Sequence, residues 1–394
     1  MNRAHASTVE IGTGPLSTAD VVRVARGGAP VRLSPGAQAA ITSARDVVEE
    51  LALSETPVYG VSTGFGALAT RHIAPEMRRQ LQRSLVRSHA AGSGAEVEWE
   101  VVRGLMLLRL STLATGHTGI KLATAELIVA LLNAGITPIV YEYGSLGCSG
   151  DLAPLAHCAL ALMGEGEVRD SRGRRLPTAE ALAEAGLAPV ELAEKEGLAL
   201  INGTDGMLGM LVLAMADLEA LLRVADLAAA MSVEGQLGTD RVFAADLQAL
   251  RPHPGQAASA ANIRALLHGS GVVASHQTGD CNRVQDAYSL RCSPQVHGAV
   301  RDTLAHARTV ADRELASAVD NPVVIDGRLE SNGNFHGAPV GYVLDFLAIA
   351  VADLASISER RTDRFLDQTR SHGLPPFLAH DPGVDSGHMI AQYT

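Results

Sequence analysis

Apolar residues recur at helical spacing over much of this chain, with polar residues in the positions between them. Such a repeat, every three to four positions, is typical of helices that bury one face. In the first half of the chain the pattern predicts four helices, at residues 37–53, 75–91, 99–115 and 122–134. The last of these ends at the stop signal Asn133-Ala134-Gly135.

From about Gly206 onward the apolar runs become longer. They predict three extended helices at residues 206–231, 296–319 and 337–363, separated by a region rich in Pro, Gly and His at residues 251–282. Three helices of this length predict a bundle, which we expect to form the core of an oligomer.

Three segments lack helical periodicity. Residues 59–66 are rich in glycine and predict a loop, and residues 140–150 predict an irregular connection. Residues 165–179 are polar and contain several arginines and a proline, which predicts a surface excursion such as a small hairpin.

The composition favours a mainly α fold. A chain of 394 residues that is 47% apolar can bury a large core and has room for two to three domains. Only 3% of its residues are aromatic, so the core must consist mainly of Ala, Leu and Val. Small aliphatic side chains of this kind indicate close-packed helices.

The charge pattern argues against a nucleic-acid partner. The net charge is −11, and only two lysines, Lys121 and Lys195, accompany the arginines. A chain without a basic run lacks the electrostatic footprint of a nucleic-acid binder. Neither GxxxxGK[ST] nor GxGxxG after a strand occurs, so nucleotide binding also has no support.

We expect a cytoplasmic protein that neither enters a membrane nor holds a metal. The N-terminus has no apolar run of a secretory signal, and charged residues interrupt the apolar segment 207–230. That segment therefore predicts a buried helix of a soluble protein. The cysteines have no CxxC spacing, which argues against zinc and favours reduced thiols: Cys148, Cys158, Cys281 and Cys292.

The most informative stretch is GSLGCSGDLAPLAH at residues 144–157. Gly150 has no side chain to keep its amide nitrogen from the Cys148 carbonyl, and the flanking glycines permit a tight backbone. Cyclisation with loss of the Ser149 hydroxyl as water would leave an electrophilic methylidene on a five-membered ring. Taken alone, Ser-Gly-Asp favours a simple turn, with Asp151 as a helix cap.

Five further blocks occur in a fixed order along the chain. They are YGVSTGFG at 59–66, LQRSLVRSHAAG at 81–92, LINGTDGM at 200–207, QDAYSLRCSPQVHG at 285–298 and SNGNFHG at 331–337. With residues 144–157 they resemble the histidine and aromatic amino acid ammonia-lyases over nearly the whole chain. The resemblance is strongest to bacterial histidine-specific members, and Cys148 resembles the actinobacterial form.

The resemblance implies the architecture and the cofactor. We expect the mainly α ammonia-lyase fold, with an N-terminal domain at 1–205 that carries the reactive tripeptide and a central helical bundle at 206–394. Family members are homotetramers whose active sites draw residues from three subunits. Cys148-Ser149-Gly150 would form 4-methylidene-imidazol-5-one (MIO), and no external cofactor is expected.

The family's catalytic residues match two tyrosines of this chain. Tyr59 matches the base that takes the β-proton of the substrate, and Tyr288 matches a second active-site tyrosine. Since a free tyrosine titrates near ~10, Tyr59 would need neighbouring positive charge or donors to act as a phenolate. Anchoring of the glycine-rich loop is the simpler alternative for Tyr59.

Three further residues match substrate-binding positions. Arg291 matches the carboxylate clamp, for which a planar guanidinium is well suited, and it would share a helix face with Tyr288. Asn202 and Gln285 match positions that hydrogen-bond the substrate and the ring. An inter-helix ion pair for Arg291 and buried amides for Asn202 and Gln285 are the alternatives.

Substrate choice is expected at Ser88-His89 and Phe335. Histidine-specific members carry Ser-His, tyrosine-specific members His-Leu and phenylalanine-specific members Phe-Leu. An imidazole at His89 can exchange hydrogen bonds with a substrate imidazole, which Phe cannot. Phe335 would line the same pocket, although either side chain could instead be packed in the core.

The chain departs from the family at three positions and at its end. Cys148 replaces Ala, Asp205 replaces Gln and Asn332 replaces Gly. The sequence stops in the apolar run 389–394, which predicts a helix without a stop signal. Since the family continues further and includes a substrate-contacting glutamate, we expect the chain to be a fragment.

The resemblance implies a carbon–nitrogen lyase that eliminates ammonia from L-histidine, a small-molecule substrate, to give trans-urocanate in histidine catabolism. An aromatic ammonia-lyase or a 2,3-aminomutase is the second possibility, because these enzymes share the electrophile. A non-catalytic structural homologue is the third, and the presence of Ser149, Tyr59 and Arg291 argues against it.

Overall fold

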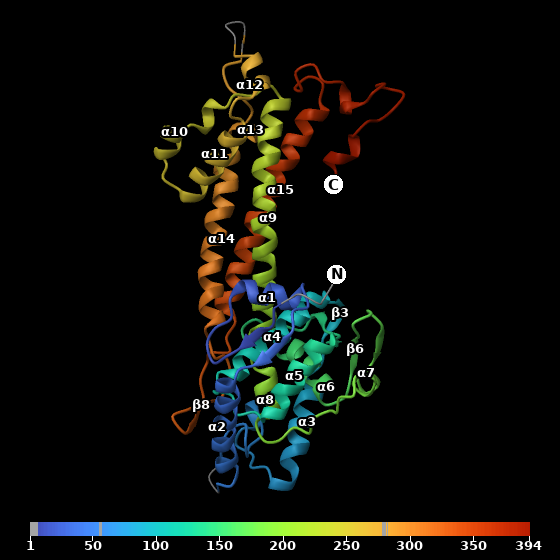
Figure 1. Cartoon of the computed structure of the whole chain (residues 1–394), viewed down its shortest axis with the longest axis vertical. Coiled ribbons are helices and arrows are strands. Elements are labelled where there is room, and N and C mark those ends of the chain that lie inside the picture. The colour runs from blue at the N-terminus through green and yellow to red at the C-terminus, as the bar shows by residue number, and fades with distance from the viewer. Residues whose placement is uncertain (1–6, 55–56, 278–280, 282) are drawn as a thin grey trace. The chain divides into compact units, whose positions relative to one another are not determined.

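The computed structural model describes residues 7–54, 57–277, 281 and 283–394. This part of the chain is mostly helical, with a few short strands (Figure 1). The mainly α class is therefore confirmed.

The described chain divides into two compact units. The first unit contains the described residues up to Ala214 together with Val310–Tyr342, and the second contains Met215–Thr309 and Val343–Thr394. A single boundary between residues 205 and 206 would assign residues 310–342 to the second domain, whereas the structure assigns them to the first unit. The division into domains at that boundary stays a prediction.

The first unit is built around one helix that is buried on every side. Helix α4 (Trp99–Ala114) has all of its residues from Val102 to Ala114 buried, because other helices of the unit surround it. The other helices of this unit are α1 (Thr18–Ala25), α2 (Pro35–Ala52), α3 (Arg78–His89), α5 (Leu122–Ala134), α6 (Leu152–Leu162), α7 (Thr178–Glu184) and α8 (Glu196–Ile201).

Short strands tie the loops of the first unit together. Antiparallel pairing joins β3 (Ser93–Glu96) to β5 (Tyr141–Tyr143), and β4 (Thr137–Pro138) to the hairpin of β6 (Glu167–Arg169) and β7 (Arg175–Pro177). The hairpin expected within residues 165–179 is thus confirmed. The remaining strands form a parallel pair, β1 (Val9–Ile11) with β2 (Val31–Leu33), and a second hairpin, β8 (Val323–Ile325) with β9 (Arg328–Glu330).

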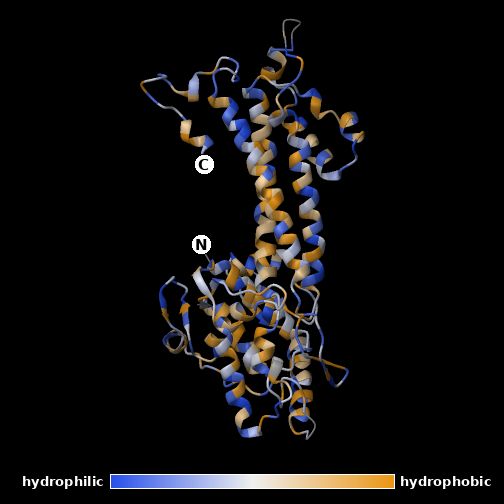
Figure 2. Ribbon diagram, turned by 180° about the vertical axis from the view of Figure 1, so that it is seen from behind, coloured by the Kyte–Doolittle hydropathy of each residue, from blue (hydrophilic) through white to orange (hydrophobic). Residues whose placement is uncertain are grey.

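Three long helices run side by side in the second unit (Figure 1). They are α9 (Asp205–Gly235), α14 (Ser293–Leu315) and α15 (Ala338–Leu366), each of which begins or ends in the first unit. Figure 2 shows apolar residues recurring along them. The shorter helices of this unit are α10 (Ala245–Ala249), α11 (Pro254–Leu266), α12 (Gly271–Ser275) and α13 (Tyr288–Arg291).

A buried carboxylate links three helices of the second unit. Asp226 on α9 accepts hydrogen bonds from His297 Nδ1 on α14 at 2.8 Å, from Arg301 on α14 at 2.6 Å and from Asn262 on α11 at 2.8 Å. These bonds hold the pKa of the Asp226 carboxyl below its usual value, although burial opposes them. Asp226 is one of the charged residues that interrupt the apolar segment 207–230, and these bonds pair it within the protein.

By length and composition one described helix, α15, could cross a membrane, a test that core helices of soluble proteins also pass.

The prediction of a helix at the end of the chain is wrong. Met389–Gln392 form only a short 3₁₀ helix without a buried residue.

Candidate functional site

The reactive tripeptide lies in a tight turn whose two ends are hydrogen-bonded to each other. The Leu146 amide donates to the Gly150 carbonyl at 3.0 Å, and the Gly150 amide donates to the Gly147 carbonyl at 3.1 Å. Gly150 adopts φ +77°, a left-handed conformation that favours glycine. The turn therefore compresses the backbone around Cys148 and Ser149.

Two other glycine-rich blocks hold this turn from outside. The Asp151 amide donates to the Gly203 carbonyl at 2.7 Å, and the Gly337 amide donates to the Gly147 carbonyl at 2.9 Å. A Cβ atom on Gly150 would overlap the Gly203 carbonyl oxygen and lie 3.2 Å from the Phe335 carbonyl oxygen. The fold thus brings together three of the sequence blocks that are far apart along the chain.

This geometry fits a ring formed from Cys148, Ser149 and Gly150. Only glycine fits at Gly150 on steric grounds, and its amide faces the turn, where it donates to the Gly147 carbonyl at 3.1 Å. Cys148 is exposed and Ser149 is half-buried, so the thiol does not occupy the space inside the turn. Replacement of the family's Ala by Cys148 is therefore compatible with the turn.

Asp151 caps a different helix from the one expected. It precedes α6, but its carboxylate accepts no bond from α6 and instead accepts from the Gly206 and Met207 amides in the first turn of α9, at 2.8 and 2.9 Å. Ser145 Oγ also donates to it at 2.6 Å. The carboxylate therefore ties both ends of the reactive turn to the start of α9.

Burial, together with the nearby Asp205 carboxylate, raises the pKa of the Asp151 carboxyl from its ordinary value of 3.8 to about 6. The hydrogen bonds from Ser145, Met207 and Gly206 oppose this shift. The first turn of α6 remains next to the tripeptide, and its positive end favours negative charge there by about 0.3–1 kcal/mol.

Asn202 is buried directly behind the turn, at the end of α8. Its side-chain amide donates to the Asn321 carbonyl at 2.8 Å, and its own carbonyl accepts from Arg109 Nη1 at 2.9 Å. Asp205 forms an ion pair with the same guanidinium, with 3.4 Å between Nη1 and Oδ2. Asp205, which replaces the family's Gln, thereby becomes part of a buried contact with Arg109.

The departure at Asn332 has a structural reason. Its side-chain amide donates to the Asp320 carbonyl at 3.1 Å, and its Oδ1 accepts from the Asn334 amide at 2.8 Å. A glycine could make neither bond. Asn332 thus shapes the loop that leads to Phe335, which is half-buried next to Gly150.

Tyr59 lies in the predicted glycine-rich loop. Its ring is half-buried and packs edge-on against Phe65, with 6.4 Å between the ring centroids. Gly60 has φ +76°, and a Cβ atom there would lie 3.2 Å from Leu198 of α8 and 3.5 Å from Pro322. The loop therefore rests on the same elements that hold Asn202.

His89 is the last residue of α3. Its Nδ1 is within hydrogen-bond distance of the Leu85 carbonyl (2.9 Å) and of Ser88 Oγ (3.0 Å), so Nε2 is the nitrogen left for other partners. Ser88 and His89 thus act as a pair at the helix end.

The other three predicted residues belong to the second unit. Tyr288 and Arg291 begin and end α13, and the guanidinium carbon of Arg291 lies 4.5 Å from the centroid of the Tyr288 ring. The shared helix face expected for them is confirmed. Arg291 Nε is buried and has no hydrogen-bond partner in the described structure.

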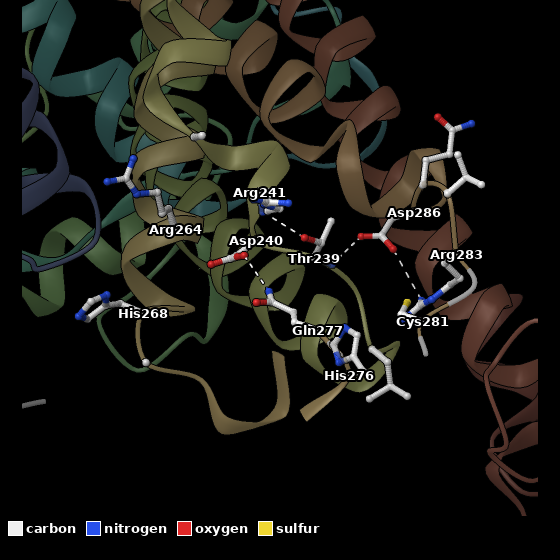
Figure 3. Close-up of a pocket in the computed structure, with 15 residues that line it drawn as sticks. Thr239, Asp240, Arg241, Arg264, His268, His276, Gln277, Cys281, Arg283 and Asp286 are labelled. Atoms are coloured by element: carbon white, nitrogen blue, oxygen red, sulfur yellow. Dashed lines mark hydrogen bonds and ion pairs between the residues drawn. The ribbon is translucent and has the colours of Figure 1, made fainter. Parts of the chain in front are cut away.

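Gln285 is exposed and lines a polar cavity of about 770 Å³ in the second unit (Figure 3). Asp286 connects two other residues of the cavity wall. Its carboxylate accepts a hydrogen bond from the Thr239 amide at 2.7 Å and forms an ion pair with Arg283 at 3.6 Å. Gln277 donates to Asp240 at 3.2 Å on another side (Figure 3).

The first unit thus assembles Cys148, Ser149, Gly150, Asn202 and Phe335, with Tyr59 on adjoining elements. Gln285, Tyr288 and Arg291 lie in the second unit, and the sharing of sites between subunits stays a prediction. The catalytic and binding roles of these residues also stay predictions.

Comparison with known proteins places the chain in a family. The sequence model of the Aromatic amino acid lyase family matches residues 16–394. The chain belongs to this family. The match covers nearly the whole chain, including every block that carries a predicted site residue.

Members of the aromatic amino acid lyase family with high similarity are histidine ammonia-lyases and aminomutases. The chain is 67% identical to a histidine ammonia-lyase of Streptomyces avermitilis, covering 98% of this chain and 76% of that protein. It superposes on the histidine ammonia-lyase of Trypanosoma cruzi with a TM-score of 0.88 at 37% identity, covering 98% and 72%. For the tyrosine aminomutase of Streptomyces globisporus the TM-score is 0.90 at 40% identity, covering 98% and 76%.

Sequence reasoning missed several buried charges that this lyase places behind the site. Arg109 donates to the carbonyls of Asn202 and Val319, and Lys195 Nζ pairs with Asp320 Oδ2 at 2.6 Å with both side chains fully buried. Arg109 interrupts the apolar run at residues 105–110, and Lys195 is one of two lysines. Both anomalies are signals for a buried, paired cation.

Proposed function

We propose that this protein eliminates ammonia from L-histidine to give trans-urocanate. The observation that carries this proposal is the turn of Cys148-Ser149-Gly150, held by Gly203 and Gly337 beside Asn202, in a chain 67% identical to a histidine ammonia-lyase. The reaction must remove a weakly acidic β-proton and expel a poor leaving group. A site with an internal electrophile and a tyrosine base addresses both difficulties.

Cys148, Ser149 and Gly150 would provide MIO as the prosthetic group. When formed, it supplies an electrophile that ordinary side chains lack and makes the substrate amine a better leaving group. The mass of the intact chain should be lower than the encoded mass by two water molecules. An unmodified mass in folded, active protein would exclude this cofactor.

Other side chains would bind the substrate and move its protons. As a phenolate, Tyr59 would take the β-proton on its oxygen and become the neutral phenol. The loop that carries Tyr59 is held in place by Leu198 and Pro322. Arg291 would hold the substrate carboxylate through its planar guanidinium, stacked on Tyr288. In the oligomer these second-unit residues would come from other subunits than Tyr59 does.

The side chains of Asn202, Gln285, His89 and Phe335 would orient the substrate. His89 would use Nε2 towards the substrate imidazole, because Nδ1 is already occupied at the end of α3. The side-chain amide of Asn202 is held by the Asn321 carbonyl, and its backbone carbonyl is held by Arg109. Such fixed polar groups favour a substrate that can pair with them.

An aromatic ammonia-lyase or an aminomutase would share the electrophile but is less well supported. The identity to tyrosine aminomutase is 40%, against 67% to the histidine ammonia-lyase of Streptomyces avermitilis. The fold matches the tyrosine aminomutase and the Trypanosoma cruzi histidine ammonia-lyase about equally well, with TM-scores of 0.90 and 0.88. The fold therefore carries no information on substrate choice, and the pocket residues carry it.

We further propose a homotetramer in a reducing cytoplasm. On α9, four apolar side chains at helical spacing are 45% to 62% exposed in the single chain, which indicates a surface that another copy covers: Leu221, Val224, Leu227 and Met231. All four cysteines are free thiols.

The decisive experiment compares substrates. Purified protein is given L-histidine, L-phenylalanine or L-tyrosine, and urocanate, cinnamate or coumarate is followed by ultraviolet absorbance. We expect kcat/KM to favour histidine by at least about a hundredfold, since a hydrogen-bonding pocket rejects analogues that leave it unpaired. His89→Phe should lower kcat/KM for histidine. Faster release of cinnamate or coumarate, or formation of a β-amino acid, would support the alternatives instead.

A further inference from the structure

His157 lies on α6 and is directed at the turn that follows His89. It was part of the sequence block at 144–157 but has no place in the proposed chemistry. Its Nε2 accepts a hydrogen bond from the Gly92 amide at 3.1 Å. Its ring is also packed edge-on against Tyr141 of β5, with 5.3 Å between the ring centroids.

The turn at residues 89–92, which begins with His89, is enclosed by α6 and the reactive segment. A Cβ atom on Gly92 would lie 3.0 Å from His157 Nε2 and 3.4 Å from Tyr141 Cβ. A Cβ atom on Gly144 would lie 3.5 Å from Gly92 Cα and 3.0 Å from Ala153 Cβ. Gly92 is therefore in close contact with both α6 and the start of residues 144–150.

Two continuous connections run from Gly92. Upstream, the Ala91 amide donates to the His89 carbonyl at 2.8 Å, so the position of Gly92 constrains that of His89. Downstream, Ser93 of β3 pairs with Tyr143 of β5, and the chain from β5 leads directly to Ser149. Helices α3 and α6 also pack against each other (Figure 1). Both connections start at Gly92, and the hydrogen bond from the Gly92 amide to His157 anchors them on α6.

The Gly92 bond requires a neutral imidazole. Nε2 can accept only when it carries no proton, which leaves the proton on Nδ1. Burial lowers the pKa of His157, which keeps the ring neutral near pH 7. An amide oxygen of Gln could accept the same bond, whereas Phe would keep the ring against Tyr141 and lose the acceptor.

We infer that His157 is a positioning residue for substrate recognition, which fixes the turn at 89–92, and with it His89, against the segment that carries Ser149. This inference rests on the proposed function, because it assigns His89 to the substrate imidazole. Loss of the acceptor leaves the Gly92 amide unpaired and loosens His89 without touching the tripeptide. Binding of histidine then weakens while the mass loss of two waters is retained.

The test compares His157→Phe with His157→Gln in the whole protein. For His157→Phe we expect KM for histidine to rise on the order of tenfold, kcat to change by less than about threefold, and the peptide at residues 89–92 to exchange its amide hydrogens faster. His157→Gln should restore KM and exchange to near the wild-type values.

Several outcomes would overturn the inference. One is an unchanged exchange rate at residues 89–92 in His157→Phe, and another is a fall in kcat at constant KM. If His157→Phe fails to fold, His157→Gln still decides, because a tenfold rise in its KM contradicts a role as acceptor. Hydrogen exchange requires no turnover, so a wild-type protein inactive on histidine would refute the proposed function and leave the positioning of the turn separately measurable.

Discussion

Gly150 shows at the scale of a residue why the reactive turn accepts no other side chain. Its positive φ disfavours any L side chain, and a Cβ atom would overlap the Gly203 carbonyl oxygen. Gly147 also has a positive φ, of 57°, but has open space around it. A side chain at Gly147 would therefore meet backbone strain alone, whereas a side chain at Gly150 would meet both strain and steric overlap.

We therefore expect Gly150→Ala to abolish ring formation, so that the chain keeps its full encoded mass and loses activity. Gly147→Ala is the matched control, because it adds only left-handed strain of roughly 1–2 kcal/mol. Intact mass spectrometry of both variants checks this expectation. Loss of two waters from Gly150→Ala would mean that the Gly203 carbonyl does not restrict the turn.

Asp151 makes stability depend on pH. Its carboxyl has an ordinary pKa of 3.8 and a folded-state pKa of about 6, so between these values the folded protein holds a proton that the unfolded chain has lost. The stabilisation is therefore complete below about pH 4 and is lost as the pH rises through 6, by about 3 kcal/mol for a shift of about two pKa units.

Asp151→Asn cannot ionise and should lack this loss. We expect the melting temperature of the variant, relative to that of the wild type, to increase between pH 4 and pH 7. The comparison of the two proteins at each pH cancels all other titrating groups. Parallel pH profiles would show that Asp151 does not titrate in this range.

Residue types and spacing in the sequence predicted the tripeptide, the loop of Tyr59 and the common helix face of Tyr288 and Arg291. The sequence did not predict that Asp151 caps α9, because its partners Gly206 and Met207 lie 55 and 56 positions further on. Long-range pairing of a polar side chain leaves no local pattern.

At the scale of elements, a buried ion pair fixes α8 and hence Asn202. Lys195 immediately precedes α8, and its partner Asp320 precedes β8, with no exposed surface on either side chain. Burial lowers the pKa of Lys195, and Asp320 opposes that shift. Removal of one partner leaves an uncompensated charge in the core.

Lys195→Met should therefore destabilise the protein by about 3–5 kcal/mol. Adding Asp320→Asn should recover much of this loss, since the amide keeps an oxygen for the Asn321 amide and carries no charge. Thermal melting of the single and double variants provides the measurement. Equal stability of Lys195→Met and the wild type would contradict the importance of the pair.

Helical periodicity predicted the long helices to within a few residues at most ends, because their apolar repeats are strong. It placed the start of α3 too early, since Pro75–Met77 form a separate 3₁₀ turn. It also misread residues 389–394, where apolar residues occur without a partner surface to make a helix stable.

At the scale of the whole molecule, the exposed apolar stripe on α9, formed by Leu221, Val224, Leu227 and Met231, should make assembly sensitive to a charge introduced within it. We expect Leu227→Glu to lower the molar mass measured by light scattering, because the carboxylate would be buried against another copy. Leu250→Glu is the matched control, since Leu250 is 83% exposed and lies outside the stripe. Equal molar masses for wild type and Leu227→Glu would remove α9 from the subunit interface.

The central claim is that Ser149 becomes the electrophile that releases ammonia from histidine. Ammonia and urocanate released from L-histidine by the wild type and by Ser149→Ala, at equal concentrations of folded protein, test it most directly. The wild type should release both products in equal amounts, and Ser149→Ala should release neither above the uncatalysed background. Wild-type turnover by Ser149→Ala would contradict the claim.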